Sequence, residues 1–283
     1  MIENLPIEII SCVLKHFDSN ELMSLAHFHT LPARVREALH EKSLWRGKTL
    51  HIKNQSDYKR CIANLQRIQY CEKVSFADSQ IHRQEMIALL GEMKRLRCLS
   101  FSGFLDLCDT ALQVVLQKHG SELRVLDLSG CQYLTNFSIS EIARRCKKLH
   151  TLILSECSFS SAALEIITES EQLTNNLRHL DISKCYLMDC GVISPLSKLY
   201  QLQILKLCSH EWLNASNLPY ILAPLRQIRQ VDIRNCEDFT RCSIDEVKRS
   251  LVAEVEIIEN TKLNDDSEES IRSYLMALIS AQV

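Results

Sequence analysis

Residues 123–131, LRVLDLSGC, carry the pattern that decides the fold, because the chain repeats this stretch at a nearly constant spacing. The frame returns as LHTLILSEC from Leu149 and as LRHLDISKC from Leu177. Looser copies begin at Cys71 (CEKVSFADS), Leu96 (LRCLSFSGF), Leu202 (LQILKLCSH) and Ile228 (IRQVDIRNC). Successive starts lie 25, 27, 26, 28, 25 and 26 residues apart, so one structural unit is used again and again.

Each copy predicts a short strand followed by a turn and a helix. Frame positions 4 and 6, such as Leu126 and Leu128, alternate as neighbours on one face of a strand do. The ninth position turns the chain away from the strand, and a buried Cys with its weak S–H donor suits that corner. That position is held by Cys131, Cys157, Cys185 and Cys236, with His210 in the odd copy.

Helical spacing follows the strands. Ile139, Ile142, Ala143, Cys146 and Leu149 recur at intervals that place them on one helix face. We expect the pairs Ser138 with Glu141 and Ser243 with Glu246 to be capping boxes at helix starts.

This pattern resembles the leucine-rich repeat, whose skeleton L-x-x-L-x-L recurs every 20–29 residues. The resemblance implies an α/β solenoid with parallel strands on the concave face and helices on the convex face. About 7–8 cysteine-containing repeats with a period of about 26 residues are expected over residues 47–260. The first would begin with a degenerate strand at residues 49–52, without a flexible linker before it.

Composition narrows the class of protein. Of 283 residues 46% are hydrophobic, and the net charge is −2 without a block of like charge, which gives no electrostatic case for nucleic acid or anionic membrane. No apolar run approaches the roughly 18 residues that span a bilayer. The acidic start MIENLPIEII argues against a targeting presequence, so a cytoplasmic or nuclear protein is expected. The odd count of 13 Cys favours reduced, buried thiols over disulfides or a metal site.

Residues 1–46 lack the repeat and predict three short helices. Pro6 lies near the start of the first, and Asp18 to Asn20 break it and cap the second. A third helix would follow Thr30-Leu31-Pro32, and Ser43-Leu44-Trp45 would close the segment. So small a unit needs a neighbour to bury its apolar surface.

This segment resembles the F-box. The residues that carry the resemblance are LP-x-E-I-I-x-x-V-L-x-x-F from Leu5 to Phe17, then Leu22, Leu25 and the closing S-L-W. The family usually has Val-Cys and a following Trp in its third helix, where this chain has Leu31, Pro32 and Val35. A divergent F-box followed by cysteine-containing repeats is the layout of the F-box/leucine-rich-repeat proteins. The alternative to an F-box is that these helices only cap the open end of the first repeat.

The resemblance implies a function. The first helices would bind the Skp adaptor of a cullin–RING ubiquitin ligase, through Leu5, Pro6, Ile9, Leu14, Leu31 and Pro32. The repeats would hold a substrate protein. The chain itself would not be an enzyme, since no catalytic constellation, phosphate loop or cofactor motif is found in it.

The concave face is the expected substrate surface, because solenoids present their broad curved face to partners. Frame positions 2, 3, 5 and 7 are expected to point to this face. An Arg ladder at position 2 runs beside a broken Asp ladder at position 5, which suits an acidic partner, although Arg and Asp can also pair with each other. The candidate contacts are Arg97, Arg124, His150, Ile153, Arg178, Ile204, Lys206, Arg229 and Arg234.

The far end predicts its own cap. Residues 252–258 alternate like a last strand, and residues 261–283 give an acidic turn and an amphipathic helix with apolar residues at 271, 274, 275, 278 and 279. That helix would cover the last repeat, or would bind a partner.

Two functions besides the ligase subunit stay open. One is a leucine-rich-repeat scaffold or inhibitor without a ligase, which the altered third helix favours. The other, an assembly factor inside an organelle, is disfavoured by the acidic start.

Overall fold

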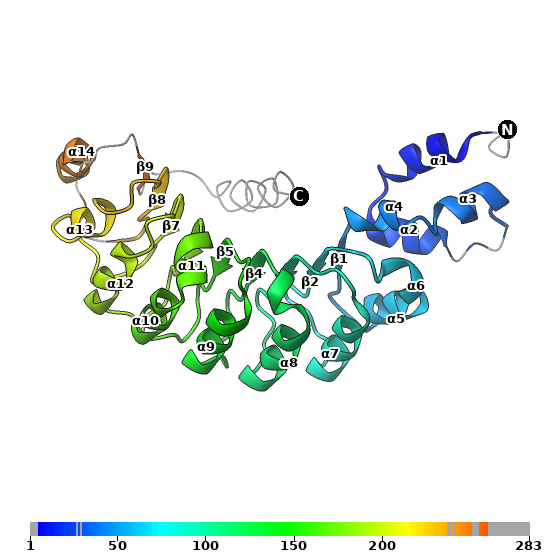
Figure 1. The fold of residues 1–283 in the computed structure, drawn as a ribbon, viewed down its shortest axis with the longest axis horizontal. Helices are drawn as coiled ribbons and strands as arrows, with labels where there is room; N and C mark the ends of the chain where they lie inside the picture. Colours follow the sequence, from blue (N-terminus) through cyan, green and yellow to red (C-terminus); the bar gives the residue numbers. More distant parts are fainter. Residues whose placement is uncertain are drawn as a thin grey trace.

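The computed structural model describes residues 5–26, 28, 30–236, 239, 241–250 and 255–259. A small helical unit is followed by a curved solenoid, with the strands along one side and the helices along the other (Figure 1). The predicted α/β leucine-rich-repeat solenoid is thereby confirmed. The predicted turn and helix at 261–283 lie outside the described residues.

In the part of the chain that the structure describes, nine strands form one parallel sheet in chain order. Each has three residues, and neighbours pair in register at every step, as Leu99 with Leu126 and Leu126 with Leu152. The strands are β1 Thr49–His51, β2 Lys73–Ser75, β3 Cys98–Ser100, β4 Val125–Asp127, β5 Thr151–Ile153, β6 His179–Asp181, β7 Ile204–Lys206, β8 Gln230–Asp232 and β9 Glu256–Ile258. The degenerate first strand and the last strand were both predicted from the sequence.

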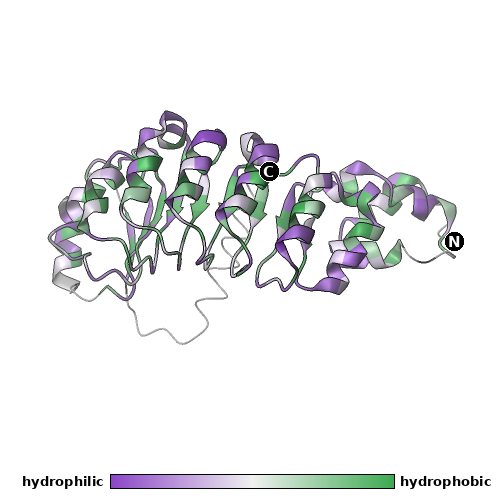
Figure 2. Cartoon of the chain, turned by 90° about the horizontal axis from the view of Figure 1, so that it is seen from below, coloured by the Kyte–Doolittle hydropathy of each residue, from purple (hydrophilic) through white to green (hydrophobic). Residues whose placement is uncertain are grey.

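Helices fill the return from each strand to the next. They are α5 Gln55–Ala63, α6 Leu65–Ile68, α7 Arg83–Glu92, α8 Asp109–His119, α9 Asn136–Arg145, α10 Ala162–Glu169, α11 Glu171–Asn176, α12 Ile193–Ser197, α13 Leu218–Leu222 and α14 Arg241–Ser250. Short 3-10 turns occupy Gly120–Glu122 and Cys190–Val192. Seen from below, both the helices and the strands carry hydrophilic as well as hydrophobic residues (Figure 2).

The core is a single run of apolar side chains from the helical unit to the last strand. Leu126 and Leu128 are completely buried, as are their counterparts Leu152 and Leu154. A strand this short cannot bury its own apolar face, so each repeat depends on its neighbours for its core.

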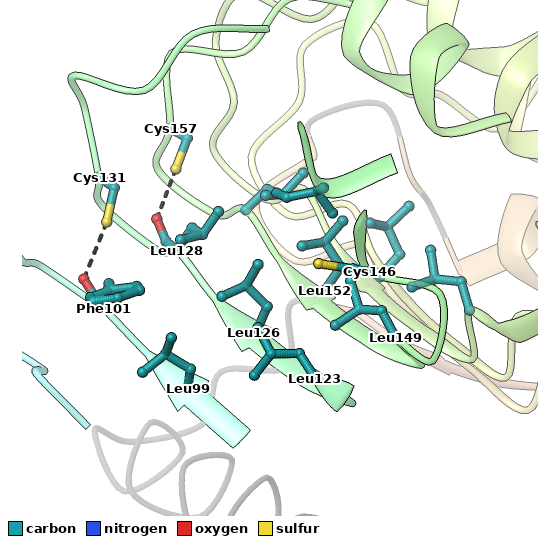
Figure 3. Packing of buried hydrophobic residues seen from close by; sticks show 14 of the residues in the cluster. Leu99, Phe101, Leu123, Leu126, Leu128, Cys131, Cys146, Leu149, Leu152 and Cys157 are labelled. Carbon is teal, nitrogen blue, oxygen red and sulfur yellow. Dashed lines mark hydrogen bonds between the residues drawn. The ribbon is translucent and has the colours of Figure 1, made fainter. Parts of the chain in front are cut away.

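The corner at frame position 9 is held by a hydrogen bond between repeats (Figure 3). Cys131 Sγ donates to the carbonyl of Phe101 at 3.2 Å, and Cys157 Sγ donates to that of Leu128 at 3.0 Å. In both cases the acceptor is frame position 6 of the preceding repeat. Cys185 and Cys236 bond in the same way to Leu154 and Leu207.

His210 fills the same corner with a different side chain. Its Nε2 lies 2.8 Å from the carbonyl of Ile182, which is again position 6 of the preceding repeat. The carbonyl is an acceptor, so Nε2 must carry the proton and donate. The odd residue of the pattern therefore supplies the same interaction as Cys.

Frame position 8 is left-handed in every copy, which the sequence reasoning missed. The positive φ angles are 67° at Gly103 and 69° at Gly130, and they recur at Asp78, Glu156, Lys184, Ser209 and Asn235. The turn off the strand requires this conformation, which costs a residue with a side chain roughly 1–2 kcal/mol. A Cβ on Gly103 would also meet Asp78 Oδ1 at 2.4 Å.

The described residues of the helical unit form four helices rather than the predicted three. They are α1 Ile7–Leu14, α2 Ser19–Leu25, α3 Ala33–Ala38 and α4 Lys42–Arg46. Residues 43–45, expected only to close the segment, form a turn of helix because Trp45 is fully buried and its Nε1 donates to the carbonyl of Leu39. The predicted cap at Asp18 is confirmed as a capping box with Glu21.

Two predicted capping boxes were wrong. Helix α9 begins earlier than expected, with Thr135 as its N-cap, so Ser138 lies inside the helix. The Ser138 hydroxyl instead donates to Asp109 of the preceding repeat at 2.5 Å, and Glu141 pairs with two arginines. Ser243 likewise lies inside α14.

Substitution of His210 tests the corner. His210→Ala removes the donor and leaves the Ile182 carbonyl without its partner, so it should lower the free energy of unfolding by about 1 kcal/mol more than His210→Cys does. Urea unfolding at pH 7.5 measures both values. Equal losses of unfolding free energy in the two variants would show that the hydrogen-bond donor at this corner does not stabilise the fold.

The difference in unfolding free energy between wild type and His210→Cys should depend on pH. Burial lowers the pKa of His210, partly offset by its bond to the Ile182 carbonyl. As the pH falls below the ordinary histidine pKa of about 6.5, the unfolded chain takes up the proton first, so this group's stabilisation is lost. The stability advantage of wild type over His210→Cys should shrink from pH 7.5 to pH 5.0, by at most about 1.4 kcal/mol per pH unit. A constant difference over that range would contradict this account.

Candidate functional site

Helix α1 has an apolar outer face. Ile9 and Val13 of this helix and Leu5, which lies just before its N-cap Pro6, are spaced by four residues, and 50%, 54% and 39% of their surfaces are exposed. Pro6 and Phe28 are exposed as well, Phe28 to 59%. The opposite side of α1 packs inward through Ile10 and Leu14. A short helix that is apolar on both sides leaves one side for a partner.

Three predicted adaptor contacts lie elsewhere. Leu14 is only 4% exposed and belongs to the core of the helical unit. Leu31 is partly buried against that core, and Pro32 is the half-buried N-cap of α3. The outer side of α3 is polar, since Arg34 and Arg36 are exposed on it.

Polar contacts fix the helical unit to the first repeats. Ser19 Oγ donates to the carbonyl of Thr49 at 2.7 Å, and Lys48 Nζ donates to the carbonyl of Phe17. Arg46 of α4 forms an ion pair with Glu72, which is fully buried and also lies 3.3 Å from Arg97. The two parts share one core, so the outer face of α1 is held at a set distance from the sheet.

The predicted substrate residues fall into two rows. Frame positions 3 and 5 lie on the strands, and there the structure places Ile153, Ile204 and Lys206. Ile153 is 6% exposed, while Ile204 and Lys206 are partly exposed. Position 2 immediately precedes each strand, at the edge of the sheet where the strands begin. It carries Arg97, Arg124, His150, Arg178 and Arg229.

The position-2 row is basic over several repeats. Burial lowers the pKa of His150, and the charges of Arg124 and Arg178 on either side lower it further. Arg178 Nη1 donates to the carbonyl of Asn175 at 2.8 Å. Among the described side chains, no carboxylate pairs with Arg124 or Arg178. These two guanidinium groups are therefore available to an acidic ligand.

Arg234 is not similarly available. Its Nε and Nη2 donate to both carboxylate oxygens of Asp232 at 2.9 and 2.7 Å. This bidentate pair stays within one repeat. Arg234 differs from the residues at this frame position in the other repeats, and it neutralises the Asp232 carboxylate, which is only 1% exposed.

Beside it, two charges meet across strands β6 and β7. Lys206 Nζ lies 3.7 Å from Asp181 Oδ2, and their side chains are 12% and 9% exposed. Burial raises the pKa of Asp181, and Lys206 offsets part of that rise. His179, on the same face, is 5% exposed, and its Nε2 has no hydrogen-bond partner among the described residues. Burial lowers its pKa to about 3.

Sequence reasoning missed several residues of these surfaces. Val13 and Phe28 belong to the outer face of the helical unit, and His179 to the concave face. A further rim follows the strands at frame positions 10 and 11, where large apolar side chains are 60–75% exposed at Leu105, Tyr133, Tyr186 and Leu187. The available signal was the return of apolar residues just after the corner.

The other chemistry is limited. Within the described ranges no group of three His, Cys, Asp or Glu side chains is placed to hold a metal ion. No helix among those residues is long and apolar enough to cross a membrane. Most of the described cysteines are buried free thiols, and burial raises the pKa of Cys146 to about 12, so that thiol stays protonated.

No protein-family model matches the chain. The BTB/POZ domain-containing protein FBL11 of Arabidopsis thaliana is 32% identical over 97 residues, which make up 31% of this chain and 10% of that protein. The chain thus matches only a small part of that relative's length.

Solved structures resemble the fold. A chain from the crystal structure of the Rad7 and Elc1 complex in yeast superposes with a TM-score of 0.51 at 14% identity, over 86% of this chain and 72% of that one. Internalin C2 of Listeria monocytogenes gives 0.47 at 15% identity, over 77% and 84%. At these identities the likeness concerns the fold alone, a leucine-rich-repeat solenoid.

The pair Asp181 and Lys206 can be tested by double substitution. Lys206→Met leaves a buried carboxylate without its cation, which should lower the free energy of unfolding at pH 7 by about 1–3 kcal/mol. Adding Asp181→Asn removes the charge and should recover most of the loss. Urea unfolding of the four proteins gives the coupling energy. Additive losses would mean that the 3.7 Å contact contributes nothing.

Proposed function

We propose that this chain is the substrate-recognition subunit of a Skp–cullin–F-box ubiquitin ligase. Its helical unit would bind the Skp adaptor, and its repeats would bind a substrate protein. The chain carries out no chemistry itself in this proposal. It raises the effective concentration of the substrate near the ligase's ubiquitin-charged enzyme.

The observation that carries the proposal is the outer face of α1. Ile9 and Val13, with Leu5 just before the helix, expose apolar surface, while the inner side of α1 already packs against the unit's own core. Apolar residues grouped in this way favour a protein partner. They lie in the segment that resembles the F-box, and Leu5, Pro6 and Ile9 are among the positions that the resemblance assigns to the adaptor.

The rigid junction supports the same function. A receptor that works by proximity must hold its two partners at a fixed separation. Ser19 bonds to Thr49 of β1, Arg46 pairs with Glu72 just before β2, and Lys48, in the two-residue connection between α4 and β1, bonds back to the carbonyl of Phe17.

A specific observation favours a second function, a protein-binding scaffold or inhibitor that uses no ligase. Where the F-box family has a Trp in the third helix, this chain has Val35, which is 8% exposed. The outer side of α3 therefore offers charged residues instead of a large apolar side chain. In this alternative the helical unit would only cover the first repeat.

Adaptor binding decides between the two functions. The full chain, co-expressed with the Skp adaptor, should form a complex on size-exclusion chromatography. Ile9→Asp and Leu5→Asp each place a charge in the centre of the apolar face, so each should weaken the complex at least about 30-fold, as expected of a hot-spot residue.

Tyr220→Asp is the matched control. Tyr220 is also a large exposed side chain, 72% exposed on α13 at the far end of the solenoid, and its substitution should leave the dissociation constant unchanged. Thermal unfolding verifies that all three variants are folded. Absence of binding by the folded wild-type chain would overturn the ligase assignment and leave the scaffold.

A further inference from the structure

The carboxylates of the concave face already have partners inside the solenoid. They lie at frame position 5, and their pairs are Asp127 with Ser100, Asp181 with Lys206 and Asp232 with Arg234. The two cations among these partners, Lys206 and Arg234, each neutralise a carboxylate of the same face. An acidic partner therefore finds little unpaired positive charge on the concave face itself.

The residues at frame position 2 form a continuous row at the edge where the strands begin. Their backbones are hydrogen-bonded from one repeat to the next. The amide of Arg124 donates to the carbonyl of Arg97 at 2.7 Å, that of His150 to Arg124 at 2.9 Å, and that of Arg178 to His150 at 2.8 Å. Neighbours in the row are thus one strand spacing apart, about 4.8 Å, and the four residues from Arg97 to Arg178 cover about 14 Å.

The positive charges of this row act on common neighbours. The Glu122 carboxyl beside the row has its pKa lowered by the hydrogen bond from Lys148 and, further, by the charges of two arginines of the row. The His150 ring lies between Arg124 and Arg178, and both of their charges add to the lowering of its pKa by burial. The potential along this edge is therefore positive over several repeats.

Further cations come from the loops that lead into the strands. Lys94 and Arg95 precede β3, Lys147 precedes β5, and all three side chains are exposed. Among the described side chains, no carboxylate pairs with any of these three or with Arg124 and Arg178. Unpaired positive charge is concentrated on this edge, in a chain whose net charge is −2.

The size of the row indicates a short acidic segment of a protein as its ligand. An extended chain rises about 3.3 Å per residue, so about five residues cover the distance from Arg97 to Arg178. Arginine suits carboxylates because its fork forms two parallel hydrogen bonds with them. Domains that bind nucleic acid are usually strongly basic, whereas this row ends at Gln203 in a chain that is slightly acidic.

We propose that the row from Arg97 to Arg178 binds an acidic segment of about five residues in the substrate protein, with carboxylates on Arg124 and Arg178. This inference rests on the proposed function, and it names the class of substrate that the repeats hold. It also moves recognition from the concave face to the edge where the strands begin.

Fluorescence anisotropy with labelled octaglutamate tests the proposal on the full chain. Wild type should bind the peptide at about 50 mM salt, and the dissociation constant should rise with added salt because exposed charges are screened. Arg124→Glu/Arg178→Glu replaces attraction by repulsion and should weaken binding at least about 10-fold. Absence of binding by wild type, or an equal dissociation constant in the variant, would overturn the proposal.

A matched control separates the row from the net charge. Lys59→Glu/Lys248→Glu changes the net charge by the same amount at exposed positions on α5 and α14, so it should leave octaglutamate binding unchanged. Equal weakening by this control would show that net charge alone attracts the peptide and would contradict a site at the row.

Charge exchange shows whether the contact is direct. Octalysine should bind Arg124→Glu/Arg178→Glu at least about 10-fold more tightly than it binds wild type, a gain that a misfolded variant would not give at a defined site. Thermal unfolding verifies that the variant is folded. A folded variant that gains no affinity for octalysine would contradict the assigned contacts.

Two further measurements fix the class of ligand and its relation to the proposed function. If an oligonucleotide of eight thymidines binds through Arg124 and Arg178 more tightly than octaglutamate does, the ligand is a nucleic acid and the proposal is wrong. The Skp adaptor should bind wild type and Arg124→Glu/Arg178→Glu equally well. Failure of adaptor binding alone would contradict the proposed function, whereas failure of octaglutamate binding alone would contradict this inference.

Discussion

The structure depends on the in-register pairing of three-residue parallel strands, repeated from β1 to β9. A three-residue strand has no stability alone, and its value lies in aligning the next repeat so that the leucines at frame positions 4 and 6 meet. The corner bond, from Cys157 or its counterparts to a carbonyl of the preceding repeat, locks the same alignment at the end of the strand. Helices, surfaces and the attached helical unit all take their positions from this alignment.

The repeat frame could be predicted because the same types of side chain recur at a fixed spacing. Burial of Leu126, Leu128 and Cys131 follows directly from their spacing, and so does the number of strands. The left-handed residue at position 8 was not predicted, because five of its seven occurrences use residues other than glycine and only the backbone reveals them. Two glycines and Asn235 at one frame position were the available signal.

Contacts between repeats limited the other predictions. Ser138 was expected to cap its own helix, but Asp109 of the preceding repeat accepts its hydroxyl. Whether Arg234 faces a partner or a neighbouring carboxylate likewise depends on Asp232, two residues away. A pattern read along the chain identifies which residues are polar, whereas the partner of each depends on the stacking. For the same reason Leu14 fitted the family's adaptor pattern yet belongs to the unit's core.

The single core that runs from α1 to β9 connects the two ends of the molecule in series. Within the described residues each repeat packs on its neighbours, so the core is the path that links the outer face of α1 to the last strands. A local opening anywhere between them, for example at β5, would leave both ends folded but free to reorient. A substitution in a middle repeat would then impair a function that needs both ends without weakening either end's own binding.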